Sequence, residues 1–249
     1  MGADRTKSSG ALDRQAERST PASADRSSAA DIAAFLERAK SVAPAAGGRR
    51  GRLIFALDAT MSRQPTWDRA CRIQAEMFVE ADKVGGLDIQ LVYFRGFGEC
   101  RASKWVSDGR RLRDMMTGLS VRGGRTQIGK VLRQAIEETR RQQVQALVYV
   151  GDSMEENIDE LCQRAGELGL SRVPMFIFQE GRDPIATQAF RELARLTGGA
   201  HLALTEGAGD ELARLLRAVA VYAAGGRKAL ADMGARGERG ARLLIEKLS

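Results

Sequence analysis

Short runs of large apolar residues recur along this chain and alternate with segments of helical periodicity. Leu53–Leu57, Ala146–Val150 and Val173–Phe178 are almost continuously apolar, as is typical of strands buried on both faces of a sheet. Between Ala146–Val150 and Val173–Phe178, apolar residues recur at intervals of three and four, which places them on one face of a helix. Strands that alternate with helices predict an α/β fold, in which a mostly parallel sheet has helices on both faces.

The remaining segments extend this pattern. Strands are also predicted at Asp88–Phe94 and His201–Leu204. Cys100–Val106 follows the first of these after a short link with two glycines, so we expect it to form one antiparallel edge strand. Further helices are predicted at Asp31–Val42, at Trp67–Val84, at Arg110–Leu119, from Ile128 onward, at Pro184–Leu196 and at Gly209–Ala223.

Composition divides the chain into four parts. Residues 1–30 are rich in Ser, Ala, Arg and Asp and have almost no large apolar side chains, so we expect a flexible N-terminal arm. Residues 31–49 predict a short helix and a linker, and residues 50–223 carry the alternating strands and helices of the main domain. Residues 224–249 form a basic C-terminal tail.

The net charge of +7 makes an acidic protein or a nucleic acid a candidate partner. The basic residues are spread along the chain among acidic ones, so nucleic-acid binding through the basic arms is kept only as an alternative. No segment approaches the roughly 20 apolar residues of a membrane span, and the N-terminus lacks the apolar core of a secretory signal. The three cysteines form no C-x-x-C pair, which favours free thiols and a cytoplasmic location.

Side chains with hard oxygen atoms gather where the predicted strands end. Asp58, Thr60 and Ser62 follow the first strand, and alternate residues of an extended turn can point to one place. Thr126 precedes a predicted helix, and Asp152 follows a buried strand. The carboxyl ends of parallel strands are where such sheets bind ligands. Two carboxylates and three hydroxyls there predict a site for Mg²⁺ or Mn²⁺.

These five residues resemble the metal-ion-dependent adhesion site of von Willebrand factor A (VWA) domains. The family's first motif usually reads Asp-x-Ser-x-Ser, and the segment from Asp58 to Ser62 is similar to it, with the hydroxyl kept at Thr60. Gly123-Gly124-x-Thr126 resembles the second motif, and residues 193–199 resemble the family's segment before the last strand. The likeness covers about residues 50–223 and implies the Rossmann-like VWA fold.

The resemblance also implies a function and roles for the residues. Thr60 or Ser62, together with Thr126, would contact the ion directly, and Asp58 and Asp152 would act directly or through water. A Glu or Asp of a protein partner would complete the coordination, so the family likeness implies a binding protein and not an enzyme. Intracellular members of the family often work beside AAA ATPases or in assembly systems, which makes such a complex the expected partner.

Several residues near these motifs are candidates for the contact with that partner. Trp67, Arg125 and Ser153 are the principal ones, although Trp67 is equally plausible in the core. Ser153 stands where the family often has Gly after the second aspartate, which leaves the geometry of that turn open. Glu155 and Glu156 are expected to stabilise the N-terminus of the next helix through its dipole, with recruitment of a cation as the alternative.

A phosphatase of the haloacid-dehalogenase type is the alternative enzyme. Those enzymes use an aspartate nucleophile at the end of the first strand and Mg²⁺ held partly by a later Gly-Asp pair, which Asp58 and Gly151-Asp152 resemble. Their first motif needs a second aspartate, as acid and base, where this chain has Thr60. The single histidine, His201, falls in the last predicted strand, a structural position that does not favour a serine hydrolase.

Overall fold

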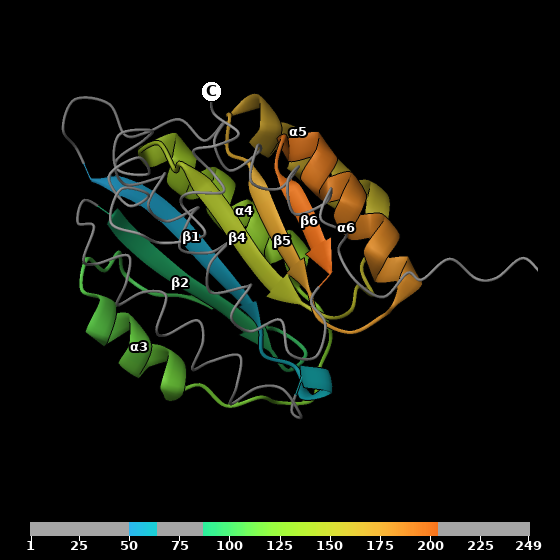
Figure 1. The fold of residues 1–249 in the computed structure, drawn as a ribbon, viewed down its shortest axis with the longest axis horizontal. Coiled ribbons are helices and arrows are strands. Elements are labelled where there is room, and N and C mark those ends of the chain that lie inside the picture. Colours follow the sequence, from blue (N-terminus) through green and yellow to red (C-terminus); the bar gives the residue numbers. More distant parts are fainter. Residues whose placement is uncertain (1–49, 64–86, 204–249) are drawn as a thin grey trace, which may run out of the picture.

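The computed structural model describes residues 50–63 and 87–203 of the 249-residue chain (Figure 1). The predicted arm, the predicted tail, Trp67 and the helices predicted at 31–42, 67–84 and 209–223 lie outside these ranges. The four-part division of the chain therefore stays a prediction.

A six-stranded sheet forms the centre of the structure. Every pair of neighbouring strands is parallel except β2 and β3, which form the expected antiparallel hairpin at one edge. The order β3-β2-β1-β4-β5-β6 confirms the predicted α/β fold with one antiparallel edge strand. The strands are β1 Gly51–Asp58, β2 Leu87–Arg95, β3 Glu99–Ala102, β4 Ala146–Gly151, β5 Met175–Gln179 and β6 Ala200–Ala203.

The third strand is shorter than predicted, because the chain leaves the ladder after Ala102. At Ser103 a side chain replaces the main chain as acceptor: the Ser103 hydroxyl accepts from the N–H of Leu91 at 3.0 Å. Val106, predicted at the end of this strand, forms only an isolated antiparallel bridge with Ile89.

Each described helix begins where the sequence supplies a reason. The side chains of Asp108, Asn157 and Asp183 accept hydrogen bonds from the first N–H groups of α3, α5 and α6. Gln127 precedes α4 but makes no such bond with its side chain. The helices are α3 Gly109–Thr117, α4 Ile128–Arg141, α5 Ile158–Leu170 and α6 Pro184–Thr197, and a single 3-10 turn, η2, spans Met61–Arg63. None of them is long and apolar enough to cross a membrane.

The main core lies between the sheet and helices α4, α5 and α6, which cover one face (Figure 1). Apolar side chains of β1, β2, β4 and β5 on this face pack against these helices and include Ile54, Ala56, Phe94, Tyr149 and Ile177. The side chains that alternate with them, such as Phe55 and Phe178, are also buried. Burial on both faces explains why the central strands read as continuous apolar runs.

Strands β1 and β4 are neighbours in the sheet, yet the chain runs from β1 to β2 on one side and only later to β4 on the other. The crevice beyond their carboxyl ends is therefore the point where strand order reverses, which is the usual ligand position in such sheets. Leu57 pairs with Val150, so Asp58 and Gly151 lie at the same level there.

Candidate metal centre

Asp58 is the last residue of β1 and is fully buried. Its Oδ1 accepts a hydrogen bond of 2.8 Å from the N–H of Thr60, which closes the turn after the strand. Its Oδ2 is buried and has no hydrogen-bond partner among the described residues. Burial raises the pKa of Asp58 to about 6 against the opposing effect of the Thr60 hydrogen bonds, and the nearby charge of Asp152 raises it further.

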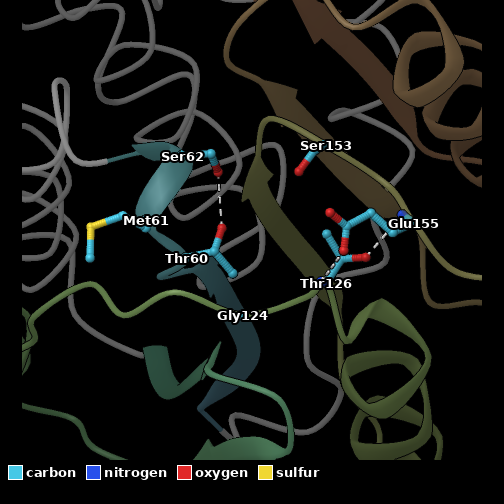
Figure 2. A pocket seen from close by; sticks show the side chains of 7 residues that line it. All are labelled: Thr60, Met61, Ser62, Gly124, Thr126, Ser153 and Glu155. Carbon is cyan, nitrogen blue, oxygen red and sulfur yellow. Dashed lines mark hydrogen bonds between the residues drawn. The ribbon is translucent and has the colours of Figure 1, made fainter.

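Beyond the end of β1 lies a pocket of about 110 Å³, which Thr60 lines but Asp58 and Asp152 do not. Figure 2 shows Thr60 and Ser62 on one side of it and Ser153, Thr126 and Glu155 on the other. The oxygens of Thr60 and Ser62 are 3.0 Å apart. The structure thus brings together three of the predicted ligands from the first and second motifs, with Ser153 beside them.

Asp152 and Ser153 follow β4, as predicted, and are half-buried. The Ser153 hydroxyl donates to Oδ1 of Asp152 at 3.3 Å. Because the charge of Asp152 raises the pKa of Asp58, the two carboxylates lie close enough to repel each other. A cation between or beside them would relieve that repulsion.

Thr126 is fixed by an exchange of two hydrogen bonds with Glu155. The Thr126 hydroxyl accepts from the N–H of Glu155 at 3.1 Å, and the N–H of Thr126 donates to Glu155 Oε2 at 3.3 Å. A hydroxyl oxygen can accept twice, so this arrangement leaves Thr126 able to bind an ion.

The two glutamates after β4 cap a different helix from the one predicted. Glu156 accepts hydrogen bonds from the N–H groups of Ile128 and Gly129. Together with Glu155 it therefore serves the N-terminus of α4, a contact that the sequence did not indicate, and their effect on the dipole of the following helix stays a prediction. The loop after β4 passes the start of α4, where Gln127 supplies no side-chain cap, whereas α5 already has Asn157.

Arg63 is a part of the site that the sequence did not indicate. Its side chain is fully buried and forms two hydrogen bonds with Glu180, of 2.8 and 3.1 Å, while Nη1 donates to the main-chain carbonyl of Asp58 at 2.6 Å. Burial lowers the pKa of Arg63, but the charge and hydrogen bonds of Glu180, together with the charges of Asp58 and Asp152, raise it overall, so the guanidinium stays charged. This ion pair fastens η2, which carries Ser62, to the residue that follows β5.

The residues present fit Mg²⁺ or Mn²⁺. No three His, Cys, Asp or Glu side chains gather in a metal-binding group within residues 50–63 and 87–203. The candidate site consists of carboxylates and hydroxyls, which hard ions prefer. The buried Oδ2 of Asp58 is the main evidence for this fit. Burial of an anionic oxygen without a hydrogen-bond partner costs free energy, and a cation would offset that cost.

The wall of the pocket is joined to the hairpin of β2 and β3. A Cβ atom on Gly124 would lie 2.0 Å from the carbonyl oxygen of Gly96, so only glycine allows this approach. The main-chain N–H of Arg125 donates to the same carbonyl at 3.2 Å, while the Arg125 side chain is exposed. Of the predicted partner contacts, Ser153 lines the pocket, Arg125 stands in the chain between the lining residues Gly124 and Thr126, and Trp67 lies outside the described residues.

Solved structures are similar to this arrangement of strands and helices. A von Willebrand factor type A protein from Catenulispora acidiphila has a TM-score of 0.57 and 16% identity, over 71% of this chain and 43% of that one. The SpRpn10 VWA domain has a TM-score of 0.50 and 14% identity, over 63% of this chain and 88% of that one. The fold is that of a VWA domain.

An aerotolerance-related membrane protein from Bacteroides fragilis, carrying multiple mutations to serine, is a third similar structure, with a TM-score of 0.53 and 16% identity. The match covers 67% of this chain and 98% of that one. No protein-family model and no curated protein matches the sequence. The likeness therefore shows the VWA fold, and the predicted fold is confirmed.

Proposed function

We propose that this VWA fold holds Mg²⁺, or Mn²⁺, beyond the ends of β1 and β4 and thereby binds a carboxylate of a protein partner. The observation that carries the proposal is the fully buried carboxylate of Asp58, whose Oδ2 has no partner among the described residues and which stands two residues before Thr60 of a pocket lined by hydroxyls. When bound, the ion supplies a positive charge that attracts an acidic side chain. Binding and not catalysis is the proposed activity.

Each residue of the site has a distinct part in this proposal. Thr60, Ser62 and Thr126 offer hydroxyl oxygens at the pocket, where an ion can reach them. Asp58 and Asp152 supply two negative charges at the inner side of the site. A set with so few charged ligands leaves an ion attractive to a further carboxylate from outside.

The surface around the pocket suits a protein partner. Phe97, in the turn between β2 and β3, is 85% exposed, and Met61, which points outward at the pocket rim, is 51% exposed (Figure 2). The Gln127 side chain donates to the main-chain carbonyls of Arg95 and Glu99, at 3.3 Å each, and thereby holds the turn that presents Phe97. Exposed aromatic side chains on well-held backbone are common centres of protein interfaces.

The kind of partner follows from the same surface. The side chain of Arg125 is exposed beside the pocket, and the chain as a whole carries a net charge of +7. We therefore propose an acidic protein segment as the partner, with an AAA ATPase or an assembly complex in the cytoplasm as the setting that the family likeness suggests.

Calorimetry with the full chain tests the metal site. Wild type is expected to bind Mg²⁺ and Asp58→Ala to lose that binding, because the buried carboxylate is removed. Asp88→Ala is the matched control, since Asp88 is a half-buried aspartate at the opposite end of β2 that pairs with Arg50. Equal Mg²⁺ binding by wild type and Asp58→Ala would contradict the proposal.

A pull-down with and without a chelator then tests the partner. Capture of a protein by wild type that is lost with the chelator and with Asp58→Ala supports the proposal, whereas capture indifferent to both counts against it. The phosphatase alternative predicts Mg²⁺-dependent release of phosphate from an aryl phosphate. We expect none, because the position of the required second acid is Thr60, whose hydroxyl shares a hydrogen bond with Ser62.

A further inference from the structure

Tyr149 is a core residue of β4 with an unusual hydroxyl group. Its ring lies 6.3 Å from that of Phe94 and 5.6 Å from that of Phe190, centroid to centroid, and the residue is fully buried. The hydroxyl has no hydrogen-bond partner among the described residues. Buried tyrosine hydroxyls nearly always have one, so this group calls for an explanation.

The hydroxyl points along the strand toward the candidate metal centre. A Cβ atom on Gly151 would lie only 2.4 Å from the Tyr149 oxygen, so the space that this glycine leaves open is where the hydroxyl lies. Tyr149 pairs with Ala56 in the sheet, and residues two positions apart share a face. The Tyr149 hydroxyl thus reaches the level of Asp58, on the same face of the sheet and on the neighbouring strand.

Two buried oxygens without partners therefore face this end of the core, and their chemistry is complementary. The hydroxyl of Tyr149 is a donor and Oδ2 of Asp58 is an acceptor. Burial, reinforced by the charges of Asp58 and Asp152, raises the pKa of Tyr149 well above its usual value, which keeps the proton on the hydroxyl. The two atoms make no direct hydrogen bond, and one water molecule accepting from the first and donating to the second would satisfy both.

We propose that Tyr149 is a positioning residue of the metal centre, whose hydroxyl holds the Asp58 carboxylate in place through one shared water molecule. This inference rests on the proposed metal site and adds to it a residue outside the motifs of the family. Gly151 is part of this arrangement, because any side chain at position 151 would occupy the space of the Tyr149 hydroxyl. Groups that orient metal ligands in this way commonly change metal affinity about 10- to 100-fold when they are removed.

The opposite view is that the hydroxyl is a packing by-product with no role. Tyr149→Phe separates the two views, because it removes one oxygen atom and keeps the ring that packs against Phe94 and Phe190. Without a role, the change removes an unsatisfied buried group, so the melting temperature stays the same or rises and Mg²⁺ affinity is unchanged. With the proposed role, Mg²⁺ affinity falls while the metal-free melting temperature does not.

The experiment compares wild type, Tyr149→Phe and Tyr93→Phe as full chains. Tyr93 is the matched control, since it lies on β2, two strands away from β4, and on the opposite face of the sheet, with its hydroxyl 3.4 Å from Glu99. For Tyr149→Phe we expect a dissociation constant for Mg²⁺ about tenfold higher than that of wild type and an undiminished metal-free melting temperature. We also expect Mg²⁺ to produce a near-ultraviolet tyrosine difference signal in wild type that Tyr149→Phe lacks. Tyr93→Phe should match wild type in all three.

Unchanged Mg²⁺ affinity in Tyr149→Phe would overturn the inference while leaving the metal site standing. Weaker binding together with a lower metal-free melting temperature would overturn it as well, since that pattern indicates damaged packing. Absence of Mg²⁺ binding by wild type would remove the proposed function and this inference together.

Discussion

At the scale of single residues, Asp58 makes stability depend on pH in the direction opposite to most carboxylates. Its pKa in the folded protein is about 6, against 3.8 for an unperturbed aspartate. Between these values the folded state binds more protons than the unfolded state, so stability falls as pH rises. The difference corresponds to about 3 kcal/mol, fully lost above about pH 6.

Metal-free protein is therefore expected to be less stable at neutral pH than at pH 5, and Asp58→Asn should lack this part of the dependence. Because the ionised carboxylate is the form that holds a cation, added Mg²⁺ should restore stability only above about pH 6. Melting temperatures across this range, with and without Mg²⁺, check both statements. A pH profile shared by wild type and Asp58→Asn would contradict the role assigned to burial.

The buried pair of Arg63 and Glu180 leads to a second prediction. Arg63→Met removes the two hydrogen bonds that Glu180 accepts from this guanidinium, and with them the contact that holds the turn carrying Ser62. Breaking a buried ion pair from one side costs about 3–5 kcal/mol, so urea unfolding should show a loss of this order. Arg122→Ala, which removes an exposed arginine 3.9 Å from Glu99, should change stability by no more than about 0.5 kcal/mol. Similar losses in the two variants would contradict the structural role of Arg63.

The sequence identified some residues of the site and missed others for one physical reason. Thr60, Ser62 and Ser153 follow predicted strands and Thr126 precedes a predicted helix, and a parallel sheet brings these positions to one edge. Arg63 and Tyr149 contribute through contacts that exist only in the folded chain. Nothing near Arg63 in the sequence indicates that its partner, Glu180, lies 117 residues away. Tyr149 belongs to a continuously apolar strand, and the sequence of such a strand does not show where the tyrosine hydroxyl points.

At the scale of elements, α4 depends on acids from another part of the chain. Glu156 accepts hydrogen bonds from the first N–H groups of the helix, which otherwise has no side-chain cap. Glu156→Ala should cost about 1–2 kcal/mol in urea unfolding and weaken Mg²⁺ binding, because Thr126 lies just before this helix. Glu137→Ala, an exposed acid in the same helix, is the control and should do neither. Unchanged stability in Glu156→Ala would show that water replaces the cap.

Elements were predicted best where burial alone determines them. The strands β1, β4 and β5 are buried on both faces, so their apolar runs are uninterrupted and the sequence locates them within a few residues. The edge strand β3 was predicted too long, because its end depends on the Ser103 hydroxyl and not on hydrophobicity. The 3-10 turn η2 was not predicted, since a single turn has no periodicity to detect.

At the scale of the whole molecule, the candidate site joins parts of the chain that are distant in sequence. Its oxygens follow β1, precede α4 and follow β4, and Glu180 follows β5. Such a site exists only in the folded state, so a bound ion stabilises the whole fold. Mg²⁺ at 100 times its dissociation constant should add about 2.7 kcal/mol, and the melting temperature of wild type should rise with Mg²⁺ concentration. A chelator or Asp58→Ala should abolish this rise in melting temperature. A wild-type melting temperature that does not change with Mg²⁺ concentration would argue against the site.

The contact between Gly96 and Gly124 has a mechanical consequence. The turn that presents Phe97 and the loop that leads to Thr126 touch backbone to backbone, and the N–H of Arg125 ties them. These two segments cannot separate without losing that hydrogen bond. We therefore expect a displacement of the turn at Phe97 to displace the loop that leads to Thr126 as well, so that contact at the outer surface and the shape of the pocket are coupled.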